Sequence, residues 1–91
     1  MRVIKRSSRF KTSFKRIVKS NSFDREVFEY VIISLASDIP LPSHYKDHQL
    51  QGKYKKLREC HISPDVLLIY EKDEDYLLLT IIDIGTHSEM F

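Results

Sequence analysis

The chain has 91 residues, of which 42% are hydrophobic and 31% are charged, and its formal net charge is +2. This composition is too apolar for a disordered chain, and the longest apolar run, 77–82, is far shorter than the roughly 20 residues of a membrane-spanning helix. A chain of this length buries only about 60% of the surface that it exposes when unfolded. We therefore expect one folded domain, residues 1–91, with one modest core and no place in a membrane.

The single cysteine, Cys60, excludes an internal disulfide and fits a reducing compartment. The charged N-terminus has no apolar core of the kind that a signal peptide needs. These features predict a cytoplasmic protein.

Basic residues gather at the start of the chain. Residues 1–20 carry eight Lys or Arg and no acid, while residues 21–91 carry seven bases and all thirteen acids. A basic face of this kind favours polyanions such as RNA, through contacts with phosphates. The same count also fits a solvated helix face without a partner, and both readings stay open.

The first half of the chain has the pattern of one strand and two helices. Residues 2–6 alternate weakly and predict a short strand, and from Ser8 the apolar residues recur at helical spacing for about three turns. Asn21 or Ser22 is expected to cap a second helix, which ends before Pro40 because proline cannot continue it. We expect the two helices to form an antiparallel hairpin.

The second half has the pattern of a sheet. Residues 44–55 show no period and predict a long loop or an irregular edge, whereas 57–62, 66–70 and 76–84 are rich in strand formers. Residues 85–86 are expected to turn the chain. The order of the elements predicts an α+β fold, in which a short N-terminal strand and a two-helix hairpin pack on an antiparallel β-sheet.

Most residues with reactive side chains lie between His44 and Asp65. Three of the four histidines, five bases and the cysteine occur there, and the fourth histidine, His87, stands near the C-terminus. Histidine exchanges a proton near neutral pH, and cleavage of RNA by its own 2′-hydroxyl needs a base, an acid and cations around the phosphate. The candidate group is His48, His61, Asp65 and His87. Taken singly, such residues can equally be solvated, and Asp65 can simply close a turn.

A metal site is the alternative chemistry. His44 and His48 are four residues apart, and Cys60 adjoins His61. However, the prolines before His44 argue against a helix there, and adjacent residues of a strand point to opposite faces. We therefore predict no metal ligands and no cofactor.

The run YKDHQLQGKYKKLRECHISPDVLLIYEKD, followed by GTHSEMF at the end, resembles the YafQ branch of the RelE/ParE superfamily of bacterial type II toxins. The motif KDH, the run from L-x-G to R-x-x-H-I-x-P-D and the terminal G-x-H-S-E-x-F occur in the order and spacing of that family. The resemblance is close over the second half of the chain and extends to the first half only in layout.

The resemblance implies a RelE-like fold and an mRNA interferase that enters the ribosomal A site and cuts mRNA without a metal. It also implies a cognate antitoxin, with a heterotetramer of two toxins and two antitoxins. By motif position the catalytic set is His48, His61, Asp65 and His87. Asp65 is expected as general base and His87 as general acid, with the other two histidines at the phosphate, although which group carries which proton stays open.

Contacts with RNA are expected from the bases near the histidines, whose charge suits phosphates: Lys46, Lys53, Lys56 and Arg58. The resemblance adds Phe91, which matches the family's terminal aromatic residue, and implies that the basic first helix contacts ribosomal RNA or the antitoxin.

The chain departs from the family pattern at two positions. Val66 stands where some relatives have an aromatic residue, which leaves the codon preference open, and Met90 replaces the usual leucine with little change in volume. The alternative function is that of a ParE-like or catalytically inactive relative that acts only by binding a protein. The histidine set argues against this alternative.

Overall fold

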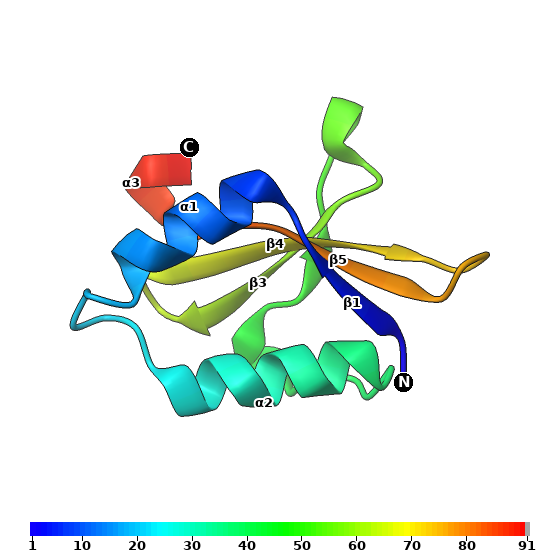
Figure 1. The fold of residues 1–91 in the computed structure, drawn as a ribbon, viewed down its shortest axis with the longest axis horizontal. Coiled ribbons are helices and arrows are strands. Elements are labelled where there is room, and N and C mark those ends of the chain that lie inside the picture. The colour runs from blue at the N-terminus through cyan, green and yellow to red at the C-terminus, as the bar shows by residue number, and fades with distance from the viewer. Residues whose placement is uncertain (91) are drawn as a thin grey trace.

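The computed structural model describes residues 1–90, and Phe91 lies outside the described residues. Within that range the strands form one sheet of five, in the order β1-β5-β4-β3-β2 (Figure 1). In chain order the elements are β1 (Val3–Arg6), α1 (Ser8–Ile17), α2 (Arg25–Ala36), η1 (Ser43–Tyr45), β2 (His48–Gln49), η2 (Gly52–Tyr54), β3 (Arg58–Ser63), β4 (Val66–Asp73), β5 (Leu78–Thr86) and α3 (His87–Met90). The α+β fold predicted from the sequence is confirmed.

The sheet differs from the prediction in one pairing. Strands β2 to β5 are antiparallel neighbours, but β1 pairs in parallel with β5, with Ile4 opposite Leu79. Parallel pairing needs a long connection between the two strands. Here most of the chain lies between β1 and β5, so the sheet is mixed, whereas the sequence predicted an antiparallel one.

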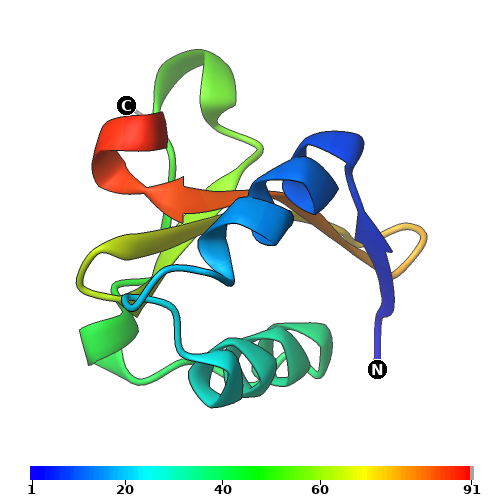
Figure 2. The ribbon, with the colours of Figure 1, turned by 60° about the vertical axis from the view of Figure 1, so that its left-hand side comes forward.

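The two helices pack against each other through phenylalanines. The rings of Phe10 and Phe28 stack at 6.2 Å, and Phe14 meets Phe23 edge-on at 5.6 Å. Figure 1 shows α2 running back against the direction of α1, as expected for an antiparallel hairpin. In Figure 2, α2 covers one side of the sheet, while α3 and the loop around η2 rise on the other side.

The cap of α2 is Asp24, and the prediction of Asn21 or Ser22 is wrong. The Asp24 carboxylate accepts a hydrogen bond at 3.2 Å from the amide three residues on. Phe23, directly before the cap, packs on Phe28 with 5.6 Å between the ring centroids, an arrangement known as a hydrophobic staple. The helix therefore starts after Phe23, where that ring can join the core.

The face of the sheet toward α2 holds the core. Cys60, Leu68 and Ile84 lie in one register row across β3, β4 and β5, and each is at most 1% exposed. Burial, the main cause, raises the pKa of the Cys60 thiol to about 12. The cysteine is therefore a small buried hydrophobe.

Gly85 lies inside β5 and does not turn the chain. A Cβ atom at this position would come within 3.3 Å of the Met90 side chain, which folds back over the strand from α3. Glycine thus leaves room for Met90, which would have to shift for any larger residue. The turn predicted at 85–86 is wrong because the strand continues to Thr86.

Among residues 1–90, no helix is both long and apolar enough to cross a membrane.

Candidate functional site

The topology brings three of the predicted catalytic residues to one end of the sheet. Asp65 stands directly before Val66 and His87 directly after Thr86, and Val66 and Thr86 are register partners in β4 and β5. Neighbouring strands lie about 4.8 Å apart. Asp65 and His87, each next to one member of this pair, therefore lie at the same end of the sheet. Both are exposed to solvent.

His61 reaches the same region from the next strand. It lies in β3, opposite Leu67, and Leu67 is in turn opposite Gly85 of β5. His61 is partly buried, two residues before the end of β3. Three strands thus deliver His61, Asp65 and His87 to one end of the sheet, although 26 positions separate the first from the last.

His48 stands at the edge of the same face. It lies in β2, and its Nε2 atom is 3.5 Å from the Glu59 carboxylate, while its Nδ1 atom is 2.7 Å from the carbonyl oxygen of Lys46. Glu59 is its register partner in β3 and is only 7% exposed. The sequence motifs do not select Glu59. The signal that could have identified it is its position on the same face of the predicted strand as His61.

A pocket opens on this face beside the row of Glu59. The row continues through Ile69 to Asp83, whose carboxylate pairs at 2.9 Å with the Arg9 guanidinium of α1. Ile69 and Asp83 line a pocket of about 200 Å³ together with Arg9, Tyr54 and Met90. The face that carries the histidines is therefore hollowed between α1, α3 and the loop around η2.

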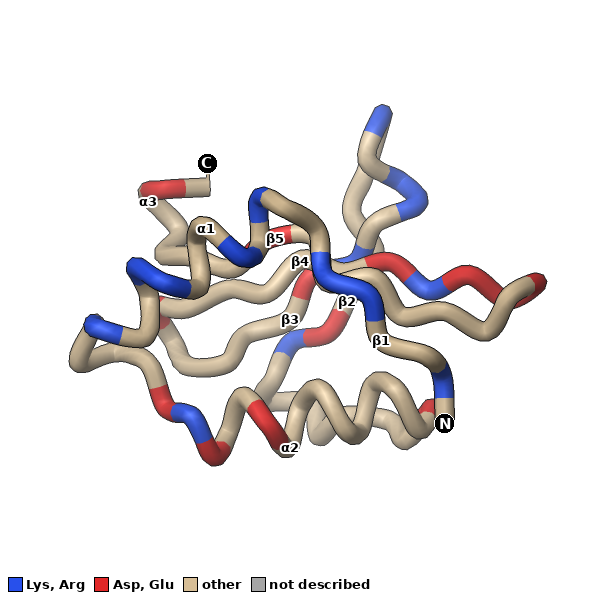
Figure 3. Tube along the Cα trace, in the orientation of Figure 1, with Lys and Arg blue, Asp and Glu red and all other residues tan. Residues whose placement is uncertain are grey.

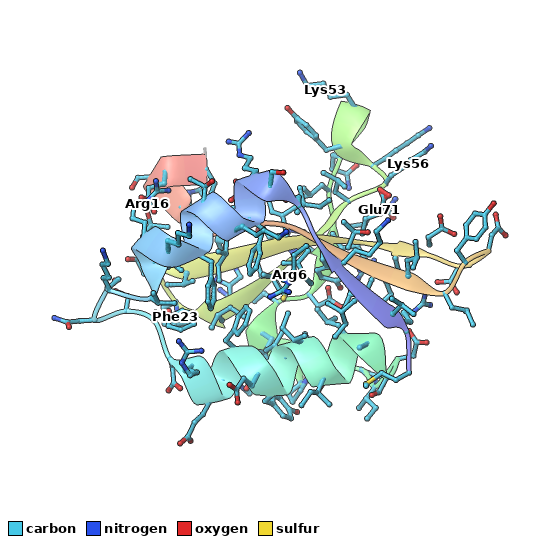
Figure 4. The ribbon with its side chains drawn as sticks, in the orientation of Figure 1. Arg6, Arg16, Phe23, Lys53, Lys56 and Glu71 are labelled. Atoms are coloured by element: carbon cyan, nitrogen blue, oxygen red, sulfur yellow. The ribbon has the colours of Figure 1, made fainter. Side chains whose placement is uncertain are left out.

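Hydrogen bonds to Glu89 tie α3 to the end of β5 around His87. The backbone amide and the hydroxyl of Thr86 donate to the Glu89 carboxylate at 2.9 and 3.0 Å. These two bonds, the amide first, lower the pKa of Glu89. The Glu89 carboxylate also pairs with Arg16 of α1 at 2.9 Å, so α3 is tied to both β5 and α1. Figure 4 shows Arg16 beside α3.

Glu89→Ala should loosen α3 and, with it, His87. The substitution removes the acceptor of both Thr86 bonds and the ion pair with Arg16, so we expect amide hydrogen exchange in α3 to rise several-fold. Exchange in β4 should stay unchanged. Glu29→Ala, which removes an exposed acid from α2, is the matched control. Equal exchange in α3 for both variants would contradict the role of Glu89.

The predicted RNA-contacting lysines fall into two places. Lys46 has a left-handed backbone with φ of 53° and lines a pocket of about 400 Å³ with His44 and His61. Lys53 and Lys56 lie on the loop around η2 and point outward from it (Figure 4). Figure 3 shows further Lys and Arg along β1 and α1, so bases lie on several sides of the site.

Arg58 does not join this group. Its register partner is Tyr70, on the face toward α2, and its guanidinium donates to the Tyr70 hydroxyl at 3.2 Å and to Asp47 at 3.4 Å. Phe91, the remaining predicted contact, is the residue outside the described range.

The described residues 1–90 include no group of three His, Cys, Asp or Glu that could hold a metal ion. The imidazole of His44 instead packs on the ring of Tyr45 at 4.2 Å.

With the geometry known, comparison with other proteins identifies the family. Residues 2–91 match the family described as the bacterial toxin of type II toxin-antitoxin system, YafQ. The chain belongs to the YafQ family of bacterial type II toxins. The resemblance drawn from the sequence motifs is thereby confirmed, and the match also covers the helical first half, where the motifs gave only a likeness in layout.

Relatives of YafQ type agree with this chain nearly end to end. The protein named mRNA interferase toxin YafQ from Escherichia coli BL21-DE3 is 35% identical over 91 residues, which is 99% of this chain and 96% of the relative. A metal-bound toxin from Helicobacter pylori has a crystal structure with 41% identity, a TM-score of 0.90 and full coverage of both chains. The crystal structure of the E. coli DinJ-YafQ complex gives 35% identity and a TM-score of 0.88, over 100% of this chain and 99% of that chain.

Proposed function

We propose that this toxin is a ribosome-dependent endoribonuclease that cleaves mRNA in the A site and uses the substrate's own 2′-hydroxyl as nucleophile. The observation that carries the proposal is the convergence of His61, Asp65 and His87 at one end of the sheet, with His48 on the edge strand of the same face. The name of the E. coli relatives, mRNA interferase, supports the choice of RNA as substrate.

The residues have the chemistry that the reaction requires. Asp65, exposed in its turn, accepts the proton of the 2′-hydroxyl as that oxygen attacks phosphorus. The bond from phosphorus to the 5′-oxygen breaks, and His87 gives that oxygen a proton, which leaves a 2′,3′-cyclic phosphate and a 5′-hydroxyl. His48, His61 and Lys46 stabilise the charge that grows on the phosphate oxygens. The side chains supply the acid, the base and the cations, so the proposed mechanism is metal-independent.

The wider RNA contacts follow from charge. Lys53 and Lys56 on the projecting loop and the basic side of α1 suit ribosomal RNA or mRNA phosphates. Arg58 and Phe91 stay predicted contacts, the first with its guanidinium already engaged by Asp47 and Tyr70.

We propose a cognate antitoxin as the protein partner, in a heterotetramer with two copies of each chain, and a cytoplasmic location for the complex. The E. coli relative has been crystallised as the DinJ-YafQ complex. A basic toxin surface is most easily covered by an acidic or amphipathic segment, which is the chemistry that we expect of the antitoxin.

Incubation with translating ribosomes should produce cuts within the A-site codon that survive metal chelation. The experiment maps the 5′ ends of the mRNA with and without a chelator selective for transition metals, at constant free Mg²⁺ so that the ribosomes stay intact. We expect equal cutting in both arms, because imidazoles and a carboxylate do the work of the metal.

Three other outcomes have defined meanings. Loss of cutting with the chelator would contradict the metal-independent mechanism. Equal cutting of free mRNA would contradict the need for the ribosome. No cutting of either substrate by a folded, toxic chain would favour the alternative, a ParE-like or inactive relative that acts through protein binding.

A further inference from the structure

A partly buried hydrogen-bonded group lies on the far side of β2 from His48. The Tyr70 hydroxyl donates to the Asp47 carboxylate, and Arg58 donates from Nε to both, at 3.2 Å to Tyr70 and 3.4 Å to Asp47. Tyr70 is 1% exposed, in the middle of β4. The three side chains form a closed triangle that joins the core of the sheet to the edge strand.

Asp47 is the chain neighbour of His48. Adjacent residues of an extended chain point to opposite sides. Accordingly, His48 faces Glu59 on the hollowed side of the sheet, while Asp47 faces Tyr70 and Arg58 on the side toward α2. The segment that carries His48 is therefore held from both sides of the sheet.

The backbone of β2 gives this segment little support of its own. The strand has two residues, with only two register pairs to β3, and it follows Lys46 in the left-handed conformation. So short an edge strand frays easily unless side chains fix it. Burial raises the pKa of the Tyr70 phenol, and its bond to Asp47 raises it further, so the hydroxyl stays a donor at neutral pH.

We propose that Tyr70, Asp47 and Arg58 form a positioning group that holds β2, and thereby the imidazole of His48, in the geometry needed for cleavage. The inference rests on the proposed function, and the positioning role needs no contact of Tyr70 or Asp47 with RNA. Displacement of a catalytic group by about 1 Å can cost on the order of a hundredfold in rate. In this way the hydroxyl of a core tyrosine fixes the position of a solvent-exposed imidazole.

The test is Tyr70→Phe, which keeps the packed ring and removes only the hydroxyl. On saturating ribosomes we expect the single-turnover cleavage rate to fall by about 10- to 100-fold, with the half-saturating ribosome concentration unchanged. Tyr76→Phe is the matched control, since Tyr76 is 76% exposed in the β4–β5 connection, and it should cleave like the parent.

A second readout does not depend on activity. In imidazole ¹H–¹⁵N NMR spectra of the free toxin, Tyr70→Phe should shift and broaden the signals of His48 and leave those of His87 in place. Asp47→Asn, which keeps an oxygen acceptor for the tyrosine, should shift His48 less than Asp47→Ala does. A group that served only global stability would give no such gradient.

The outcomes separate the inference from the proposed function. A folded Tyr70→Phe protein with the parental rate and unmoved His48 signals overturns the inference. If Tyr70→Phe does not fold, Asp47→Ala decides by the same two measurements. If the parent itself fails to cleave, the proposed function falls, and the response of His48 in the NMR spectra still supports or overturns the positioning role.

Discussion

His87→Gln is expected to reduce the single-turnover rate of mRNA cleavage on saturating ribosomes by about 10² to 10⁴, the usual range for general acid–base catalysis. Glutamine keeps much of the size and hydrogen-bonding capacity of histidine but cannot deliver a proton at neutral pH. The fold should tolerate the change, because His87 is exposed and α3 is held by the bonds of Thr86 and Glu89. Ribosome affinity should also change little.

The control for this variant is Ser88→Ala, which alters the next residue of α3 without touching an imidazole. It should cleave within a few-fold of the parent. Circular dichroism and ribosome binding check the fold and the affinity of both variants. A folded His87→Gln protein that cleaves at nearly the parental rate would remove His87 from the mechanism.

The sequence located the candidate residues but could not show how they meet. The motifs placed His61, Asp65 and His87 correctly on a strand, a turn and the C-terminal segment. Their convergence depends on the register of β3, β4 and β5, and these ladders contain irregularities, one between Ile69 and Tyr70 and another between His61 and Ser63. A shift of one residue moves each side chain to the other face, and alternation alone does not reveal it.

The partners of the site residues were missed for the same reason. Glu59 contacts His48, and Tyr70 contacts Asp47, only because distant segments pair across the sheet. Tyr70 looked like an ordinary core residue in an apolar run. A buried hydroxyl needs a hydrogen-bond partner, but the sequence does not say which polar residue supplies it.

The errors in the fold have local explanations. Asn21 and Ser22 are also good capping residues, so residue type alone predicts a cap of α2 that is too early. The spacing of Phe23, Asp24 and Phe28 fits a hydrophobic staple with Asp24 as the cap. Glycine often forms turns, and this preference alone predicts a turn at Gly85. Here it makes room for Met90 instead, a contact that only the position of α3 explains.

A substrate with 2′-deoxyribose at the scissile nucleotide should not be cut. The proposed reaction has no other nucleophile, because the 2′-oxygen attacks phosphorus after losing its proton to Asp65. The measurement compares the rate of A-site cleavage for matched mRNAs that differ only at this sugar. We expect no detectable product for the deoxy substrate over a time in which the ribose form is fully cleaved.

Two controls make this result specific. An mRNA with 2′-deoxyribose one nucleotide downstream of the cut should be cleaved like the parent, which excludes a general effect of the sugar on decoding. Asp65→Asn should slow cleavage of the ribose substrate by about 10² or more, since the amide cannot accept the proton, while the exposed turn tolerates the near-isosteric change. If the deoxy substrate is still cut, water is the nucleophile, and Asp65 does not activate the 2′-hydroxyl. The products then decide between the two mechanisms, because attack by water cannot leave a cyclic phosphate.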